Sequence, residues 1–240
     1  MSVFVISDLH LSSSVNKSMT AFGKRWSNYT QRIKSNWEKL VSENDTVIIP
    51  GDISWGINLS ECKEDFKFIE ALPGKKIILK GNHDLWWDTI SKTVKFFEEN
   101  KIHSVSLLQN NAYLCEDIIV CGSRGWFLDE KTQKTVGDPN YAKIISRELI
   151  RLRLSLDEGV KLKRQNPQCE IIAFLHFPPV FGGFVCEEII QLLEEYEIKR
   201  CFFGHIHDPF VKCGRFEYRS IKMELISADH IEFVPIKIGS

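Results

Sequence analysis

The sequence Lys80-Gly81-Asn82-His83-Asp84 follows the apolar run Ile77–Leu79, which is typical of a buried strand. It places an amide oxygen, an imidazole and a carboxylate next to one another. The amide oxygen can bind a metal, the imidazole can donate a proton, and the carboxylate can fix the tautomer of the imidazole. Taken alone, the same residues are equally consistent with a turn, because Gly and Asn tolerate positive φ angles.

The same arrangement, an apolar run followed by polar residues, recurs along the chain. We interpret four further runs as buried strands: Val3–Ser7, Thr46–Pro50, Glu170–Leu175 and Arg200–Phe203. In the same order, they lead into Asp8 and His10, Gly51-Asp52, His176, and Gly204-His205-Ile206-His207. The carboxyl ends of strands in an α/β sheet line the ligand crevice. We therefore expect these side chains to meet at one rim.

Each group of residues has a structural alternative when it is considered alone. Asp8 and His10, two residues apart at a strand end, would point the same way and bind one cation, or Asp8 would cap a turn. A single histidine such as His176 is usually structural. His205 and His207, two residues apart after a glycine, are a stronger metal signal.

The remaining periodicity indicates a single α/β domain over residues 1–240. Amphipathic helices are predicted at 29–41, 60–72, 89–100, 139–164 and 186–196, with Ser60 capping the second. A hairpin turning at Glu116-Asp117 is predicted, and the tail Phe216–Ile238 alternates as antiparallel strands with a turn near Ala228-Asp229. No repeat or linker interrupts the chain. We expect the tail to add a second sheet packed on the first, with helices outside both.

Composition limits the partners of the protein. With 240 residues, 43% of them hydrophobic, the chain can bury a sizeable core. A formal net charge of −1 gives no general attraction to nucleic acid or to anionic membranes. The N-terminus lacks a basic leader, and no apolar run approaches the roughly 20 residues that span a bilayer. Seven cysteines without a Cys-x-x-Cys motif indicate buried free thiols in a reducing compartment, so we expect a cytoplasmic protein without a membrane partner.

The polar residues after the strands form a mixed oxygen and imidazole ligand set without thiolate. Such a set suits Mn²⁺, Fe, Zn²⁺, Co²⁺ or Ni²⁺ better than Ca²⁺. It is too large for one ion, so we expect two metal ions that share a bridging carboxylate. Arg124 lies in a loop between Gly122 and Gly125, where it would either clamp a substrate phosphate or remain solvated.

The ordered set Asp8-x-His10, Gly51-Asp52, Gly81-Asn82-His83-Asp84, His176 and Gly204-His205-x-His207 resembles the calcineurin-like metallophosphoesterase family. The motifs are individually short but jointly specific, and they extend over residues 8–207. The resemblance implies a four-layer αββα sandwich of two packed mixed sheets flanked by helices. It also implies hydrolysis of phosphate mono- or diesters by attack of a metal-bridging hydroxide at a dinuclear site.

The resemblance also assigns roles to individual residues. It implies that Asp52 bridges both metal ions. It places Asp8, His10 and His207 on one ion, and Asn82, His176 and His205 on the other. His83, paired with Asp84, would face the substrate together with Asn82 and would stabilise the phosphoryl group or protonate the leaving oxygen.

Two departures from related patterns narrow the expected substrate. The sequence Gly51-Asp52-Ile53-Ser54-Trp55 lacks the second Asp of Gly-Asp-x-x-Asp, and Asp84 replaces a usual Glu, so the pattern of the protein Ser/Thr phosphatases is broken. His83 replaces the Arg of the lipid A precursor hydrolases. The chain thus resembles the small bacterial-type phosphoesterases, with a phosphate-ester substrate whose identity the sequence leaves open, as it does the oligomeric state.

Two other functions compete with a phosphoesterase. Some relatives of this fold have lost catalysis and serve as interaction scaffolds, but such loss should first remove ligand residues, and here the full set is present. A metal-dependent nuclease would need a basic groove with aromatic side chains or an added domain. The near-neutral charge and the short chain argue against a nucleic-acid substrate.

Overall fold

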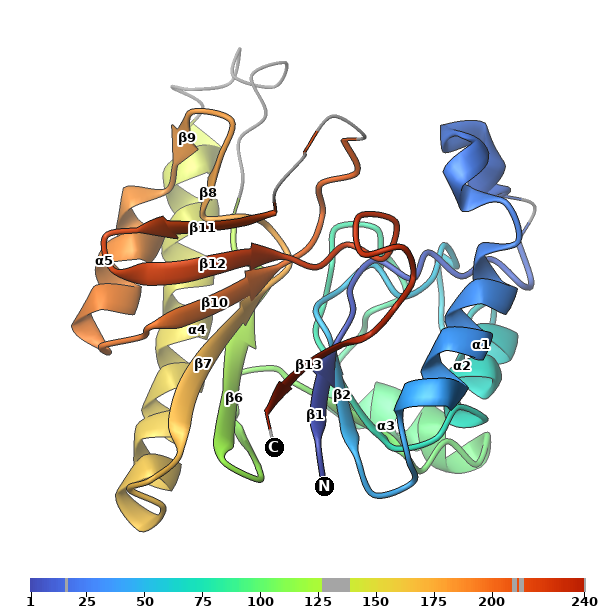
Figure 1. The fold of residues 1–240 in the computed structure, drawn as a ribbon, viewed down its shortest axis with the longest axis horizontal. Helices are drawn as coiled ribbons and strands as arrows, with labels where there is room; N and C mark the ends of the chain where they lie inside the picture. Colours follow the sequence, from blue (N-terminus) through green and yellow to red (C-terminus); the bar gives the residue numbers. More distant parts are fainter. Residues whose placement is uncertain (16, 127–138, 209–210, 212–213, 240) are drawn as a thin grey trace.

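The computed structural model describes residues 1–15, 17–126, 139–208, 211 and 214–239. The strands among these residues form two large mixed sheets and a short hairpin (Figure 1). One sheet has the order β13-β1-β2-β3-β4: β13 (Ile236–Gly239), β1 (Val3–Val5), β2 (Thr46–Ile49), β3 (Lys75–Ile78) and β4 (Val105–Leu107). The other has the order β11-β12-β10-β7-β6-β5: β11 (Arg215–Tyr218), β12 (Ile221–Leu225), β10 (Arg200–Phe203), β7 (Glu170–Leu175), β6 (Ile118–Ser123) and β5 (Tyr113–Cys115). The hairpin joins β8 (Val180–Phe181) to β9 (Phe184–Val185).

Helices cover the outer face of each sheet, which makes four layers (Figure 1). The five-stranded sheet is covered by α1 (Tyr29–Leu40), α2 (Lys63–Glu70) and α3 (Ile90–Glu99). The six-stranded sheet is covered by α4 (Pro139–Gln165) and α5 (Glu187–Glu195). Two 3-10 turns, η1 (Met19–Phe22) and η2 (Lys24–Trp26), precede α1. The expected αββα sandwich of two mixed sheets is confirmed.

The apolar runs of the sequence fill the space between the two sheets. Val5 and Ile48 of the five-stranded sheet share one buried cluster with Val120 and Phe174 of the six-stranded sheet. Separate clusters lie between each sheet and its helices. Because the central strands are covered on both faces, they need apolar side chains at successive positions rather than at alternate ones. This is why they appear in the sequence as continuous apolar runs.

The strands that precede the polar motifs are parallel to one another. In the first sheet β1 pairs with β2 and β2 with β3 in parallel, and in the second β7 pairs in parallel with β6 and β10. Antiparallel pairing occurs towards the sheet edges, between β13 and β1, β11 and β12, and β5 and β6. Parallel pairing brings the carboxyl ends of the central strands of a sheet to the same edge.

Two local predictions were wrong. Helix α2 begins at Lys63 rather than after Ser60, because Asn58 Oδ1 accepts hydrogen bonds from the Ser60 hydroxyl (2.6 Å) and the Glu61 amide (3.1 Å) and forms a separate turn first. The tail forms antiparallel pairs and a turn at Ala228-Asp229 as expected, but it does not add a sheet of its own, because β11 and β12 belong to the six-stranded sheet and β13 to the five-stranded one. The connection from β12 to β13 therefore crosses from one sheet to the other.

The cysteines that the structure describes are buried as free thiols, as the composition predicted. Cysteines 62, 115, 121, 169, 186 and 201 are buried and free, whereas Cys213 lies outside the described residues. Burial raises the pKa of the Cys121 and Cys201 thiols to about 12, so both stay protonated at neutral pH. None of the described helices combines the length and the apolar character needed to cross a membrane.

Candidate active site

The polar residues that follow the parallel strands converge at one rim of the sandwich. Two groups have ligand atoms that lie within 4.8 Å of one another. The first group is Asp8, His10 and His207, and the second is Asp52, His176 and His205. Each group combines residues from both sheets, because residues 8, 10 and 52 follow strands of the five-stranded sheet and residues 176, 205 and 207 follow strands of the six-stranded one. The rim predicted from the sequence is therefore a junction between the two sheets.

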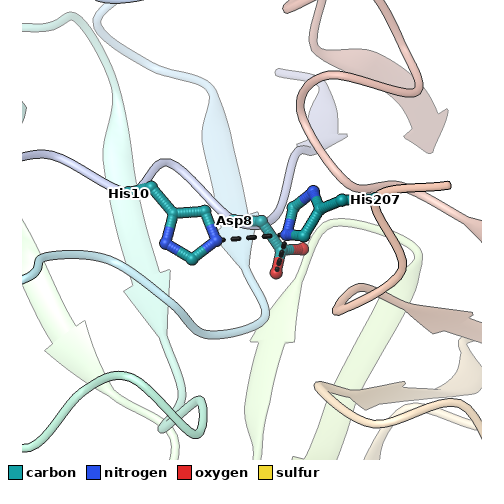
Figure 2. A group of neighbouring side chains, drawn as sticks. All are labelled: Asp8, His10 and His207. Carbon is teal, nitrogen blue, oxygen red and sulfur yellow. Dashed lines mark hydrogen bonds and ion pairs between the residues drawn. The ribbon is translucent and has the colours of Figure 1, made fainter. Parts of the chain in front are cut away.

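In the first group, two imidazoles face each other beside a buried carboxylate. His10 Nε2 lies 3.1 Å from His207 Nε2, and His207 Nε2 lies 3.6 Å from Asp8 Oδ1 (Figure 2). Asp8 and His10 are buried, and His207 is partly exposed. Burial opposes ionisation of Asp8, but its hydrogen bond and attraction to His207, with the nearby histidines, lower the pKa of Asp8. A carboxylate oxygen and two ring nitrogens thus point at one small volume.

In the second group, the side-chain oxygen of Asn82 joins two histidines. Asn82 Oδ1 lies 2.6 Å from His176 Nε2 and 2.9 Å from His205 Nδ1. His176 is fully buried, and this burial lowers the pKa of its imidazole to about 3. The ring is therefore neutral, which is the form of histidine that binds a metal.

Asp52 belongs to the second group and also approaches the first. Its Oδ2 atom is 3.6 Å from His10 Nε2, and its Oδ1 atom is 3.5 Å from His176 Nε2. Asp52 is buried, and burial together with the negative charges of Asp8 and Asp84 raises its pKa well above the usual value. One carboxylate thus offers an oxygen to each group in surroundings that favour a nearby positive charge.

The backbone at the rim is held in an unusual conformation. Asp8, His10, Asp52 and His205 have φ angles of 59°, 46°, 52° and 72°. Positive φ is uncommon outside glycine and costs of order 1–3 kcal/mol at each residue. The loops after β1 and β2 run side by side and stabilise the angles of Asp8, His10 and Asp52, since the His10 amide donates to the Asp52 carbonyl at 2.9 Å.

The glycines of two motifs leave room for the carboxylates. A Cβ atom at Gly81 would lie 2.1 Å from Asp52 Oδ1, and one at Gly204 would lie 2.2 Å from Asp8 Oδ2. Neither neighbour can move without displacing a candidate ligand. Gly precedes Asn82 and His205 because the carboxylate of Asp52, from the neighbouring strand, and that of Asp8, from the other sheet, occupy the space of a side chain.

Asp84 has a different role from the one predicted. Its carboxylate is fully buried and accepts hydrogen bonds from the backbone amides of residues 52, 53, 54 and 81 and from the Trp86 indole, at 2.7–3.3 Å. These five donors occupy both oxygens of the carboxylate. Asp84 therefore fixes the loops after β2 and β3 in place of orienting the His83 imidazole.

His83 lies at the first group beside Trp55, which sequence reasoning did not connect with the site. The His83 and Trp55 ring centroids are 4.2 Å apart, and Trp55 stacks on His10 at 4.9 Å. The Lys17 ammonium lies 3.0 Å above the Trp55 ring. Burial and the charge of Lys17 lower the pKa of His83 to about 4. The Trp55 ring thus packs against the imidazoles of His10 and His83 and restricts their orientation.

Asp229 is a further residue of the site that sequence reasoning missed. Its carboxylate Oδ1 lies 2.7 Å from His207 Nδ1, and its Oδ2 lies 2.8 Å from the Arg25 guanidinium. Burial opposes protonation of His207, but the hydrogen bonds with Asp229 and Asp8 outweigh it and raise the pKa of His207 to about 10. Asp229 follows β12, whose sequence Ile221-Lys222-Met223-Glu224-Leu225 alternates apolar and polar residues, so no continuous apolar run marked this position in the sequence.

Comparison with known proteins agrees with this geometry. A family model described as calcineurin-like phosphoesterase matches residues 1–209. The chain belongs to the calcineurin-like phosphoesterase family. No curated protein matches the chain by sequence. Members of this family are generally hydrolytic and bind divalent metals, so the family implies a metal-dependent phosphoesterase acting on a phosphate ester.

Solved structures resemble this calcineurin-like phosphoesterase over almost its whole length. A protein of unknown function from Aquifex aeolicus aligns with a TM-score of 0.55 at 16% identity, covering 98% of this chain and 95% of that one. Phosphopantetheinyl hydrolase from Mycobacterium tuberculosis aligns with a TM-score of 0.51 at 16% identity, covering 99% and 95%. A protein from Thermus thermophilus aligns with a TM-score of 0.55 at 9% identity, covering 99% and 97%. At these identities the likeness shows the shared fold.

The donor set of this calcineurin-like phosphoesterase fits divalent metal ions. Asp52 Oδ2 is buried and has no hydrogen-bond partner among the described residues. His10 Nε2 and His207 Nε2 approach to 3.1 Å, so both ring nitrogens face the same small volume. Metal ions would accept lone pairs from all of these atoms at once. Imidazole, carboxylate and amide donors together suit Mn²⁺, Fe, Zn²⁺, Co²⁺ and Ni²⁺.

Arg124 lies at the edge of the site, away from the two ligand groups. Its guanidinium is 3.4 Å from Glu148 Oε1 of α4 and 5.9 Å from the Phe177 ring centroid. Its side chain is 25% exposed, so Arg124 is not the freely solvated loop arginine that was the structural alternative. The Arg124 guanidinium instead contacts the buried Glu148 carboxylate and the Phe177 ring.

Proposed function

We propose that the protein hydrolyses phosphate mono- or diesters at a dinuclear metal centre, with activation of a water molecule between the metal ions. The position of the Asp52 carboxylate carries this proposal. Its two oxygens face different ligand groups, at 3.6 Å from His10 and 3.5 Å from His176. A carboxylate in this position can bridge two cations, and its negative charge offsets their mutual repulsion.

The proposal divides the ligands as the two groups divide. Asp8, His10 and His207 would hold one ion, and Asn82, His176 and His205 the other, with Asp52 on both. The bound ions would supply charge neutralisation and a more acidic water molecule. The protein supplies fixed ligand positions and, through Asp229, the orientation of one imidazole.

We assign His83 to the substrate rather than to a metal ion. It is not a member of either ligand group, and its backbone amide donates to Asp52 Oδ1 at 2.8 Å, which places its ring at the edge of the first group. The ring would donate a proton to the leaving oxygen or a hydrogen bond to the phosphoryl oxygens. With the Asp84 carboxylate committed to the loops, the Trp55 ring fixes the imidazole instead.

The proposal is tested by metal reconstitution followed by kinetics. Protein stripped by a chelator and reloaded with each of the five metals should bind about two ions per chain and hydrolyse p-nitrophenyl phosphate or its diester. Elemental analysis gives the metal content and absorbance gives the rate. Full metal loading without turnover on any ester would favour an interaction scaffold over an enzyme.

A His83→Ala variant separates chemistry from metal binding. It should keep its metal content but lose about 10²- to 10⁴-fold in kcat, which is the usual contribution of a positioned acid or base. If His83 protonates the leaving oxygen, the loss should be large for alkyl esters and small for nitrophenyl esters. If it stabilises charge on the phosphoryl oxygens, both ester classes should lose comparably. Loss of metal in this variant would contradict the ligand assignment.

A further inference from the structure

A pocket of about 500 Å³ lies at the carboxyl ends of β3, β4 and β6 and is closed on one side by residues of α4. Four basic side chains line it: Lys80 from the loop after β3, Arg124 from the loop after β6, and Arg147 and Arg151 from α4. None of the seven expected metal ligands is among the described residues that line this pocket. The pocket is therefore separate from the two ligand groups, although it opens on the same rim.

Two chain connections place the pocket next to the second ligand group. Lys80 lines the pocket and is two residues before Asn82, which joins His176 to His205. On the other side, the Arg124 carbonyl accepts a hydrogen bond from the Phe177 amide at 2.9 Å, and the Phe177 ring lies 4.5 Å from the His205 ring. A small molecule bound at the ligand groups thus has the pocket as its neighbour on this side.

Positive charge exceeds negative charge in the pocket. Its two acidic residues are Glu148 and Asp88, and Asp88 already pairs with Lys92 at 3.1 Å. Glu148 is 1% exposed and its Oε1 atom contacts both Arg124 and Arg151. One buried carboxylate therefore holds two guanidiniums in place but neutralises only one of them.

The polar atoms of this network are not all satisfied within the protein. Glu148 Oε2 and Arg124 Nε are buried and have no hydrogen-bond partner among the described residues. An anion in the pocket would accept hydrogen bonds from the guanidiniums and would reduce the repulsion among the cations.

We propose that this pocket is a subsite for a second anionic group, a phosphate or a carboxylate, on the substrate whose ester phosphate binds at the two ligand groups. The inference rests on the proposed phosphoesterase function and specifies its substrate class as small esters that carry a second anion. The apolar side chains of Trp87 and Leu108 line the pocket together with the basic residues. The whole chain has a net charge of −1, so this positive region is local. Both features favour a small molecule over an extended polyanion.

The subsite is tested with non-hydrolysable phosphonates. Alkane bisphosphonates of graded chain length are compared, each with the alkylphosphonate of the same length, as inhibitors of p-nitrophenyl phosphate hydrolysis. The best bisphosphonate should inhibit about 10- to 100-fold more strongly, the range expected for charge-assisted hydrogen bonds. A carboxyalkylphosphonate series shows whether a carboxylate gives the same gain.

The double variant Arg147→Ala/Arg151→Ala should lose most of this gain. Arg147 is exposed and the Arg151 side chain is 50% exposed, so their removal leaves the core intact. Arg153→Ala is the control, because it removes an arginine charge from the same helix at a residue that pairs with Glu195 outside the pocket. The control should be inhibited like the wild type. Equal inhibition by the two phosphonate classes overturns the subsite. A gain in inhibition that survives in the double variant also overturns it, because chelation of the metal ions by a bisphosphonate would give that result.

A binding measurement separates the subsite from the proposed function. Calorimetry of alkylphosphonate binding to metal-free protein requires no hydrolysis. Binding that Arg147→Ala/Arg151→Ala weakens about tenfold or more, and Arg153→Ala does not, supports the subsite even if no ester is hydrolysed. Binding that is indifferent to the double substitution overturns the subsite even if esters are hydrolysed.

Discussion

Replacing Asp84 by Asn should destabilise the protein strongly, although the two side chains have the same shape. Asp84 Oδ2 accepts hydrogen bonds from the amides of residues 52 and 81, and Oδ1 accepts from the amides of residues 53 and 54 and from the Trp86 indole. Whichever way an Asn amide lies, its NH₂ group replaces an oxygen that accepts at least two of these bonds. Two or more buried donors then lose their acceptor.

The magnitude follows from that count. A buried donor left without an acceptor costs about 1–3 kcal/mol, so Asp84→Asn should lower the free energy of unfolding by about 2–6 kcal/mol. This is a large part of the roughly 5–15 kcal/mol that stabilises a typical domain. Because the lost donors belong to the loops that carry Asp52 and Asn82, metal affinity should fall as well.

The assay is denaturant unfolding of metal-free protein, so that metal binding does not contribute to the difference. Burial raises the pKa of Asp84 to about 6, and its hydrogen bonds oppose this shift. Measurement at about pH 8 therefore keeps the wild-type carboxylate ionised. Asp88→Asn, at an exposed residue paired with Lys92, is the control and should leave stability unchanged. A loss below about 1 kcal/mol in Asp84→Asn would refute the assignment of Asp84 as the anchor of the two loops.

Three further substitutions test other parts of the structure. Asp52→Asn should abolish ester hydrolysis and lower the metal content, since a neutral amide bridges two cations poorly; normal turnover with both metals retained would contradict the bridging role. Asp229→Asn should weaken metal binding about 10- to 100-fold in a metal titration while Asp8, His10 and His207 stay in place, because it removes the charge that orients His207. Lys76 is buried, and burial lowers its pKa from 10.5 to about 8 despite Glu70 and Glu43, so the folded state holds this proton less tightly than the unfolded state does. Wild-type stability should therefore rise relative to Lys76→Met as the pH rises from 8 to 10.5, and parallel pH curves would show that Lys76 is not desolvated.

The positions of the site residues along the strands could be predicted from the sequence because they depend on a local pattern. A continuous apolar run indicates a strand covered on both faces, and the first polar residues after it lie where that cover ends. This argument located Asp52, Asn82 and His176 without knowledge of the sheet order. It does not reach Asp229, because the strand before it alternates apolar and polar residues, and this residue was predicted to lie in a turn.

The orientation of the same side chains could not be predicted in this way. Asp8 and His10 were expected to point together because they alternate along an extended strand. Strand β1 ends at Val5, and both residues adopt positive φ, so they reach one group through a bent loop. Asp84 was expected to contact His83 because the two are adjacent, but three of its five donors are backbone amides of a loop some 30 residues away. Such contacts depend on the packing of two loops, which carries no local signal.

The loops after β2 and β3 hold each other by a reciprocal exchange of hydrogen bonds. The Asp84 carboxylate accepts from the Asp52 amide at 2.9 Å, and the Asp52 carboxylate accepts from the His83 amide at 2.8 Å. This exchange fixes two buried acids close together, and the repulsion between them contributes to the raised pKa of Asp52. The two acids have different roles. Both oxygens of Asp84 accept hydrogen bonds from backbone donors. Asp52 Oδ2, in contrast, faces His10 and has no hydrogen-bond partner among the described residues. One acid thus stabilises the loops so that the other can remain available to cations, and for this reason the loss of Asp84 should be seen first in stability and the loss of Asp52 first in metal binding.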